Sequence, residues 1–298
     1  AEVIEGKVIT ITAQALGQAA AINQQLSSNT IVNVISEQKI QELPDANAAE
    51  AMGRLPGVSV QRSGGEANKI VLRGLSDKFS TFTVDGVRIA GTEADSRGLD
   101  LSTISQGSLA GIELFKALTP DKDADAIAGS INLVTKKAPS ERLIRLDSKG
   151  AYGRMDKTTN QYDFSFRYGE RFFEDALGVQ VNANIEQRNR SKENMSVSYA
   201  QNVPLNGVPN SDWKINEFTP LYTNEIRQRQ GAGLILDFET PDGGSIKFSN
   251  IYNQTSRDYA DNSRNYPIDG SEIIYETRIR KQDISTFNSA ITGDNYLF

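Results

Sequence analysis

The chain has 298 residues, enough for two domains, and its net charge of −6 comes with dispersed basic residues that form no stripe for a nucleic acid. It has neither cysteine nor histidine, which removes disulfides, thiol catalysis, the two commonest zinc ligands and the usual general base near neutral pH. We therefore expect a protein that is not an enzyme, binds no nucleic acid and needs no metal or cofactor. No stretch approaches the roughly 18 consecutive apolar residues of a transmembrane helix, so any passage through a membrane would be made by strands.

Residues 1–30 hold one β-prone run, Val8-Ile9-Thr10-Ile11-Thr12, followed by small and polar residues that can build little core. This composition predicts a flexible N-terminal arm. A short extended segment in such an arm exposes backbone donors and acceptors that can pair with the edge of another protein's sheet.

The next part of the chain, up to residue 139, predicts a small α+β domain. Ser36 caps one short helix, and a second is capped by Asp45 or by Asn47, which is spaced for a capping box with Glu50. Further β-prone segments lie at 31–35, 58–60, 70–72, 81–84, 87–89, 112–115 and 131–135. Asp85-Gly86 predicts a tight hairpin turn between two of them.

After Pro139 apolar and polar residues alternate with a period of two, the pattern of a strand with one apolar face. Such segments lie at 142–154, 162–168, 177–186, 230–239, 245–253 and 274–287. Their connections alternate between tight turns and long loops, with long loops expected over 190–227 and 257–271, as in an outer-membrane barrel. These strands are too few to close around another domain, so the sequence predicts only the first part of a larger antiparallel transmembrane β-barrel.

Four motifs follow one another in the first half of the chain: Ile70-Val-Leu-Arg73-Gly74, Thr83-Val-Asp85-Gly86-Val87, Gly111-Ile-Glu113-Leu and Ala128-Gly129-Ser-Ile131-Asn132. In this order they resemble the plug domain of TonB-dependent outer-membrane receptors. The resemblance implies an α+β plug domain followed by an antiparallel transmembrane β-barrel of about 22 strands, of which this chain would hold the N-terminal part. It also implies import of a scarce solute across the outer membrane, energised by TonB and its inner-membrane complex, with the plug and the arm facing the periplasm.

The resemblance assigns candidate residues to two sites. The run from Val8 to Thr12 resembles the TonB box, through which the family engages TonB. Arg73, Gly74, Asp85 and Gly86 match the central plug motifs, with Gly74 permitting a positive φ and Asp85 building the turn with Gly86. Arg73 would either pair with inward carboxylates of the barrel or lie on the surface beside the hairpin.

Aromatic residues after Pro139 suggest two further roles. Tyr199, Trp213 and Tyr222 lie in the expected long loop, where they would stack on a sugar or a catechol, or contact an outer-membrane partner. Tyr152, Phe172 and Phe173 lie near strand ends and predict part of an aromatic girdle against outer-membrane lipid. Nothing in the sequence selects one solute.

The expected organisation is an arm over 1–30, a plug domain over 31–139 and the first strands and loops of the barrel over 140–298. A soluble alternative stays open, in which a plug-like periplasmic interaction or signalling module is followed by a β-sandwich, because sandwiches also alternate apolar and polar residues. The two hypotheses differ in whether the strands after Pro139 present an outward apolar band.

Overall fold

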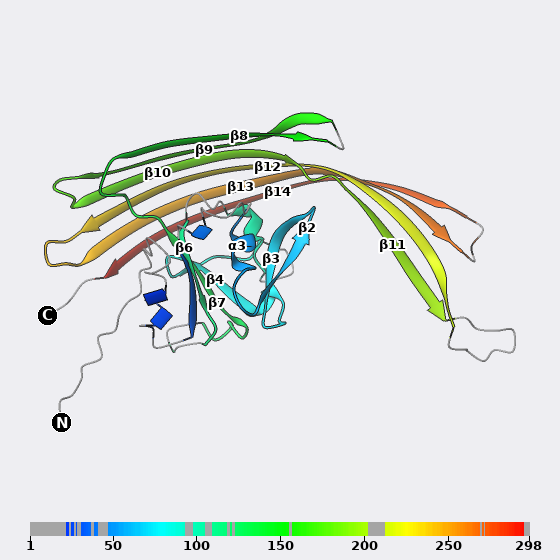
Figure 1. The fold of residues 1–298 in the computed structure, drawn as a ribbon, viewed down its shortest axis with the longest axis horizontal. Coiled ribbons are helices and arrows are strands. Elements are labelled where there is room, and N and C mark those ends of the chain that lie inside the picture. The colour runs from blue at the N-terminus through cyan, green and yellow to red at the C-terminus, as the bar shows by residue number, and fades with distance from the viewer. Residues whose placement is uncertain are drawn as a thin grey trace, which may run out of the picture.

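The computed structural model has two parts, a small domain and a large curved sheet whose concave face covers it (Figure 1). The small domain consists of the elements between Val32 and Thr135, and we call the curved sheet between Leu143 and Asp294 the wall. The structure describes residues 22–23, 25–26, 28, 31–36, 39–40, 47–92, 98–104, 109–117, 120, 123–154, 157–201, 212–268, 270 and 272–294. None of the described helices is both long enough and apolar enough to cross a membrane.

The small domain is built on a five-stranded sheet with the strand order β1-β6-β7-β4-β5. These strands are β1 (Val32–Ser36), β4 (Ser80–Val84), β5 (Val87–Arg88), β6 (Leu109–Phe115) and β7 (Gly129–Thr135). All neighbours are antiparallel except β4 and β7. The remaining elements are the hairpin of β2 (Val58–Ser63) and β3 (Glu66–Leu72), the helix α3 (Ala48–Met52) and the short 3-10 turns η1 (Asp77–Phe79) and η2 (Leu101–Thr103).

Local sequence signals account for several of these elements. Asn47 is the N-cap of α3, where its side chain accepts a hydrogen bond from the backbone N–H of Glu50 at 3.1 Å. Asp85 and Gly86 form the β4–β5 turn with φ values of 49° and 83°, as a tight hairpin requires. The predicted α+β domain followed by an antiparallel sheet is therefore confirmed as the fold class. Of the helix expected after Ser36, only residues 39 and 40 are described.

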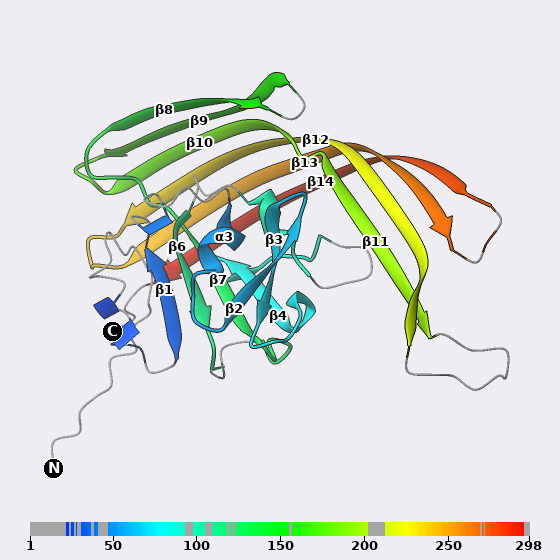
Figure 2. The same ribbon diagram turned by 45° about the vertical axis from the view of Figure 1, so that its right-hand side comes forward.

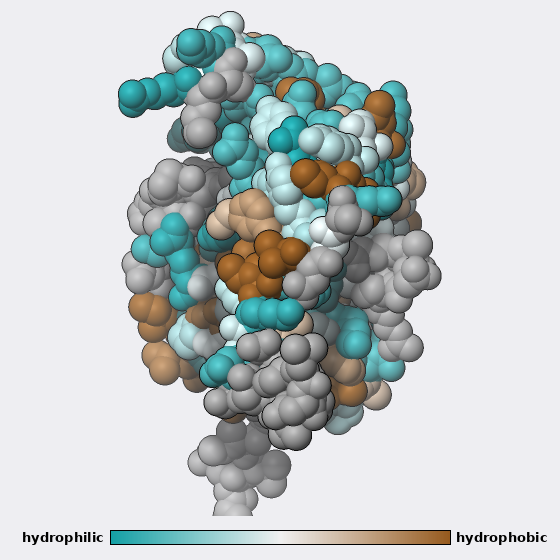
Figure 3. All heavy atoms as spheres, turned by 90° about the vertical axis from the view of Figure 1, so that its right-hand side faces the viewer, coloured by the Kyte–Doolittle hydropathy of each residue, from teal (hydrophilic) through white to brown (hydrophobic). Residues whose placement is uncertain are grey.

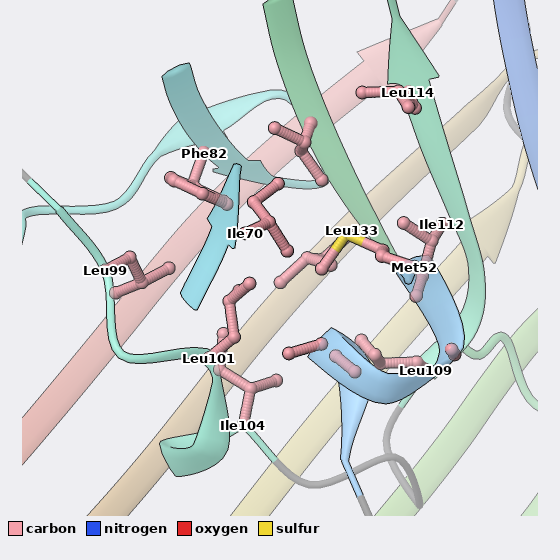
Figure 4. Close-up of a cluster of buried hydrophobic side chains, with 14 of the residues drawn as sticks. Met52, Ile70, Phe82, Leu99, Leu101, Ile104, Leu109, Ile112, Leu114 and Leu133 are labelled. Carbon is pink, nitrogen blue, oxygen red and sulfur yellow. The ribbon is translucent and has the colours of Figure 1, made fainter. Parts of the chain in front are cut away.

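The core of the small domain lies between its sheet and the α3 and β3 segments (Figure 4). Met52, Ile70, Ile112 and Leu133 come from four different elements, and each is completely buried. Among the described residues, Ile251 is the single wall residue that joins this apolar cluster. The small domain is therefore held together by its own core, and contacts of another kind attach it to the wall.

The wall is antiparallel throughout, with the order β14-β13-β12-β10-β9-β8 and β11 paired with β12. Its strands are β8 (Leu143–Gly153), β9 (Thr158–Phe172), β10 (Leu177–Asn189), β11 (Lys192–Gln201), β12 (Trp213–Glu239), β13 (Ser245–Pro267) and β14 (Ile274–Asp294). Because β10 and β11 both pair with β12, β11 continues β10 beyond a break at residues 190 and 191. Figure 2 shows this pair extending far beyond the small domain.

The prediction of two long loops, over 190–227 and 257–271, is wrong. The span 190–227 contains β11 and the first half of β12, and β13 runs on to Pro267 through the second expected loop. The sequence hides these extensions because they carry polar side chains on both faces, so the two-residue apolar period is lost although the strand pairing continues.

The pairing register gives the wall two distinct faces. Along β12 the odd-numbered residues from 223 to 237 are all buried on the concave side, while Gln228, Gln230, Ala232, Leu234 and Phe238 are exposed on the convex side. The concave side faces the small domain (Figures 1 and 2). Side chains that contact the small domain are therefore found at alternate positions of each strand.

We expect Leu133→Ala to lower the free energy of opening of the small domain by about 2–5 kcal/mol, because it leaves a cavity in a fully buried site. Native-state hydrogen exchange of the backbone amides of β6 and β7 in the full-length protein measures this. Leu75→Ala is the matched control, since Leu75 is 37% exposed and should change the value by less than about 1 kcal/mol. Equal effects of the two substitutions would contradict the assigned core.

Candidate functional site

The candidate site is the contact between the small domain and the wall, which is mostly polar. The buried polar residues on the concave face of the wall are Gln180, Asn182, Thr223, Glu225, Arg227, Arg229, Asp237, Ser249 and Thr255. Buried polar groups need hydrogen-bond partners. Three groups of contacts across the boundary supply them to Arg227, Arg229 and Asp237 of this face and also engage Arg190 and Lys247. We name them the Glu66 cluster, the hairpin contact and the linker contact.

The Glu66 cluster consists of Glu66 of the small domain and Arg190, Arg227, Arg229 and Glu225 of the wall. The side chain of Glu66 is completely buried. Its Oε2 accepts hydrogen bonds from Arg227 at 2.8 Å and from Arg229 at 2.6 Å, and Arg190 lies 3.4 Å away. Its Oε1 accepts a second bond from Arg229 at 2.9 Å. One carboxylate of the small domain is thus enclosed by three arginines of the wall.

Partners on both sides orient the carboxylate and its arginines. Within the small domain, Asn47 donates to Glu66 Oε1 at 3.0 Å, so the residue that caps α3 also positions the acid. Within the wall, Glu225 Oε1 accepts from Arg227 at 2.9 and 2.6 Å and from Arg257 at 2.9 Å. Arg227 therefore bridges a carboxylate of the small domain and a carboxylate of the wall.

The charges around Glu66 also set its protonation. Burial by itself would raise the pKa of Glu66, but the charge and hydrogen bonds of Arg229, with the charges of Arg190 and Arg227, outweigh burial and hold that pKa below its usual value. Glu66 is therefore ionised across the physiological pH range, and the cluster depends on that negative charge.

Glycine at the tip of the β2–β3 hairpin permits the close approach. Gly64 has a φ of +61°, and a Cβ there would lie 3.2 Å from the Cβ of Arg190 and 3.3 Å from its carbonyl oxygen. Arg190 lies at the break between β10 and β11, where its backbone N–H donates to Glu225 O at 2.8 Å. The tip of the small domain thus rests against the point where the long strand of the wall is interrupted.

The hairpin contact joins the β4–β5 turn to β13. Asp85 accepts hydrogen bonds from the backbone N–H of Thr135 at 3.0 Å and from its hydroxyl at 2.6 Å, and it pairs with Lys247 Nζ at 2.9 Å. Lys247 also donates to the carbonyl oxygen of Thr135 at 3.2 Å. Asp85 thus ties the turn both to the end of β7 and to the wall. Gly86 donates its N–H to Asn132 Oδ1 at 2.9 Å, which fixes the turn further.

The linker contact holds the segment that leads from β7 into β8. Asp237 accepts from the backbone N–H of Ala138 at 3.0 Å and from Arg171 at 2.8 Å, and Arg171 also donates to the carbonyl oxygen of Ala138 at 3.3 Å. Gly178 lies beside Asp237, where a Cβ would collide with the carboxylate. The crossing from one part of the molecule to the other is therefore fixed at Ala138.

The structure separates the candidate residues that the plug motifs assign. Asp85 and Gly86 lie in the hairpin contact, whereas Arg73 and Gly74 form a turn with φ values of 54° and 77°, and Arg73 is exposed. Besides Asp85, the small domain contributes the charge of Glu66 to the wall, and sequence reasoning missed this acid. The turn glycines before Glu66 mark a hairpin, but no local pattern distinguishes this acid from a surface residue.

The three aromatic candidates lie on strands rather than on a loop. Tyr199 is in β11, while Trp213 and Tyr222 are in β12, and their exposed fractions are 61%, 68% and 44%. The register places Tyr222 on the convex side, opposite to Glu225 and Arg227. Their role in solute binding stays a prediction. The candidate segment from Val8 to Thr12 lies outside the described residues.

A pocket of about 390 Å³ opens on the wall beyond the Glu66 cluster, toward the long strand extensions. It is lined by Asn194, Met195, Ser196, Thr219, Leu221, Asp261, Ser263, Glu276 and Arg278. Most of these side chains carry hydroxyl, amide or charged groups, while Met195 and Leu221 are apolar. The described residues contain no group of acids that could hold a metal ion.

We expect Glu66→Gln to destabilise the attachment of the small domain by about 3–5 kcal/mol, because it leaves buried arginines without their counter-charge. Native-state hydrogen exchange of β2 and β3 in the full-length protein should show this loss while exchange in the wall strands stays unchanged. The control is Glu276→Gln, whose ion pair with Arg278 is more than half exposed and should contribute less than about 1 kcal/mol. Similar changes for both variants would refute the central role of Glu66.

The low pKa of Glu66 also predicts an acid dependence. A carboxyl group whose pKa is depressed in the folded state contributes stability above its unfolded pKa of about 4.3, and that contribution disappears as the pH falls toward the folded value. The difference in denaturation midpoint between the native protein and Glu66→Gln should therefore be constant near neutral pH and shrink below about pH 4. A difference that stays constant through that range would show that Glu66 does not titrate as assigned.

The small domain matches a known family. Residues 24–130 match the family model described as TonB-dependent Receptor Plug Domain, a range that includes Glu66 and Asp85. The vitamin B12 transporter BtuB of Photobacterium profundum is 30% identical over 124 residues, which is 40% of this chain and 20% of that protein. BtuB of Vibrio vulnificus is 32% identical over 145 residues, which is 47% of this chain and 22% of that protein. The chain spans about a fifth of the length of these curated relatives.

Solved structures resemble a larger share of the chain. The siderophore receptor PirA from Acinetobacter baumannii is similar over 89% of this chain and 49% of its own, with 15% identity and a TM-score of 0.47. The unliganded ferric citrate transporter FecA is similar over 91% of this chain and 54% of its own, with 12% identity and a TM-score of 0.45.

Proposed function

Because this chain belongs to the TonB-dependent receptor family through its plug domain, we propose that it is the N-terminal part of an outer-membrane transporter that imports a scarce solute. In this proposal residues 1–30 are the arm that meets TonB, 31–139 are the plug, and 140–298 are the first strands of a barrel whose wall encloses the plug. The plug and the arm face the periplasm.

The observation that carries the proposal is the polar attachment of the plug. A domain that must move needs contacts that can break without exposing a large apolar surface to water. The Glu66 cluster and the hairpin contact meet this need, because water can hydrate each separated charge. Ile251 alone among the described wall residues enters the apolar core of the plug, so little hydrophobic attachment opposes the movement.

The solute would meet the wall above the plug. The pocket lined by Ser196, Asp261 and Arg278 lies on the strand extensions, and residues of the same strands form the Glu66 cluster. Glu225 lies four positions from Leu221, which lines the pocket, so a solute there would be only a short distance along β12 from the attachment of the plug. This placement supports a path from outside toward the plug.

A soluble module is the alternative, and the convex face of the wall argues against it. Large apolar side chains are exposed there on every strand from β8 to β14, for example Leu146, Phe166, Ile185, Met195, Leu234 and Phe287. Water-soluble monomers rarely leave so much apolar surface uncovered. The direct test is the full-length protein taken from outer membranes. It should need detergent and migrate differently on a gel before and after heating, whereas full solubility without detergent would favour the module.

The role of the arm can be tested with backbone chemistry. If Val8 to Thr12 pairs with the edge of a TonB sheet, Ile9→Pro removes a backbone donor and should weaken binding of the purified C-terminal domain of TonB by at least tenfold. Ile9→Ala keeps the backbone donor and should change the affinity by less than about threefold. Calorimetry with the detergent-solubilised full-length protein gives both values. Unchanged binding by the proline variant would remove this segment from the TonB contact.

A further inference from the structure

We propose that four glutamines on the convex face of the wall mark the outer boundary of the bilayer and bind the polar head groups of its outer leaflet. These residues are Gln187, Gln228, Gln230 and Gln254, and we call them the amide belt. The inference rests on the proposed membrane location of the wall and adds to it a defined depth and tilt. It follows from the strand register, the exposure of side chains and the hydrogen bonds among the amides.

The convex face carries an apolar band that stops at the amide belt. On β12 the outward residues from Phe238 through Leu236 and Leu234 to Ala232 are apolar, and the next two are Gln230 and Gln228. On β13 the corresponding change comes between Tyr252 and Gln254. Asn250 of β13 and Ser289 of β14 face each other inside the band as a local polar pair. Beyond the belt, the outward side chains no longer form a continuous apolar surface.

The band ends in one row on β14, β13 and β12, one outward position further on β10 and two further on β9, whereas on β8 Leu146 is followed outward by Ser148 and Gly150. Gln230, Ile185 and Phe164 lie in one hydrogen-bonded row across β12, β10 and β9. In this row the residue of β12 is polar, whereas the residues of β10 and β9 are apolar. On β9 the apolar side chains continue one outward position further, to Tyr162, which lies opposite Gln187. Between β12 and β9 the edge of the band therefore crosses the rows at an angle.

Between β13 and β9 the shift of the edge agrees with the slope that tilted strands in a flat bilayer produce. From β13 to β9 there are three strand steps, or about 14 Å at 4.8 Å per step. For strands tilted by about 40°, a horizontal plane shifts along the strands by about 12 Å over that distance, which is close to four residues or two outward positions. The observed shift, from the edge after Tyr252 on β13 to the edge after Tyr162 on β9, is also two outward positions.

The belt residues are linked by their side chains across the strands. Gln228 Nε2 donates to Gln187 Oε1 at 2.7 Å, and Gln187 Nε2 donates to the carbonyl oxygen of Asn160 at 2.7 Å. Gln230 donates to Gln254 Oε1, which also accepts from the hydroxyl of Tyr252 at 3.0 Å. These bonds fix the amides side by side along the edge of the band. Phosphate and hydroxyl groups of lipid head groups can bond to their remaining donors and acceptors.

The end of the wall beyond the belt looks different from the band. Figure 3 views the molecule from the side that carries the strand extensions, and hydrophilic surface there surrounds separate small hydrophobic patches. Charged residues such as Asp258, Arg264 and Lys281 lie on the outward positions of β13 and β14 beyond the belt. The extensions therefore suit water, and the belt separates them from the lipid-facing band.

Depth can be measured with spin labels on the full-length protein in vesicles of phosphatidylethanolamine and phosphatidylglycerol. Single cysteines replace Leu234, Ala232, Gln230, Gln228 or Ile226 in a background without other cysteines. Dissolved oxygen should relax the labels at 234 and 232 more strongly than a water-soluble nickel complex does. The nickel complex should relax the labels at 228 and 226 more strongly than oxygen does. The crossover, where the two reagents have equal effects, should lie at 230. The matched control is Phe164→Cys, which shares a row with Gln230 and should still favour oxygen by at least threefold.

Binding by the amides is tested with a second variant. Gln230→Leu combined with Gln254→Leu should move the crossover on β12 by one outward position, so that the label at 228 gains oxygen contact. Asn262→Leu, on the same face but beyond the belt, should leave the crossover in place. An unmoved crossover in the double variant would overturn the assigned role of the amides.

Other outcomes separate the further inference from the proposed function. If Phe164 and Gln230 behave alike, the tilt is wrong and the belt does not mark the boundary. If the label at 230 is reached by neither reagent, another protein covers the belt and the lipid assignment falls. If labels at 234 and 232 prefer the nickel complex, the wall does not lie in a bilayer, and the proposed membrane function fails with it.

Discussion

A carboxylate that is cut off from water must be surrounded by positive charge, and the rest of this structure depends on how that requirement is met for Glu66. Three arginines of the wall reach it, and Glu225 and Asn47 hold the arrangement from the two sides. The cluster explains why the wall carries buried charges at alternate positions of β12. It also makes the attachment specific, because a displaced plug would leave several buried charges without partners.

The three attachments have different chemical characters. The Glu66 cluster is a network of buried charges, the hairpin contact is a single ion pair supported by Thr135, and the linker contact uses backbone groups of Ala138. The first two join residues distant in sequence and can separate into hydrated ions. The third lies where the chain itself passes into the wall, so covalent continuity reinforces it. The plug is therefore held firmly at one end and reversibly elsewhere.

Local signals could be read from the sequence, whereas long-range ones could not. The cap at Asn47, the turn at Asp85-Gly86 and the alternation from Tyr162 to Tyr168 depend on neighbouring residues, and the structure confirms them. Glu66 is different, because its partners Arg227 and Arg229 lie 161 and 163 residues away and nothing near Glu66 points to them. The strand β11 was not predicted for a related reason. Its pairing with β12 defines it, and its sequence has no apolar period of two.

The fixed crossing at Ala138 has a mechanical consequence. In the proposed transporter, a force applied before residue 31 would act at one end of the plug, while the other end continues through Ala138 into β8 of the wall. The plug would then rotate about the linker contact at Asp237. The Glu66 cluster, far from this contact, would have to break for the rotation to occur. After such a rotation the plug can return to its original position, because the linker contact at Ala138 stays attached to the wall throughout.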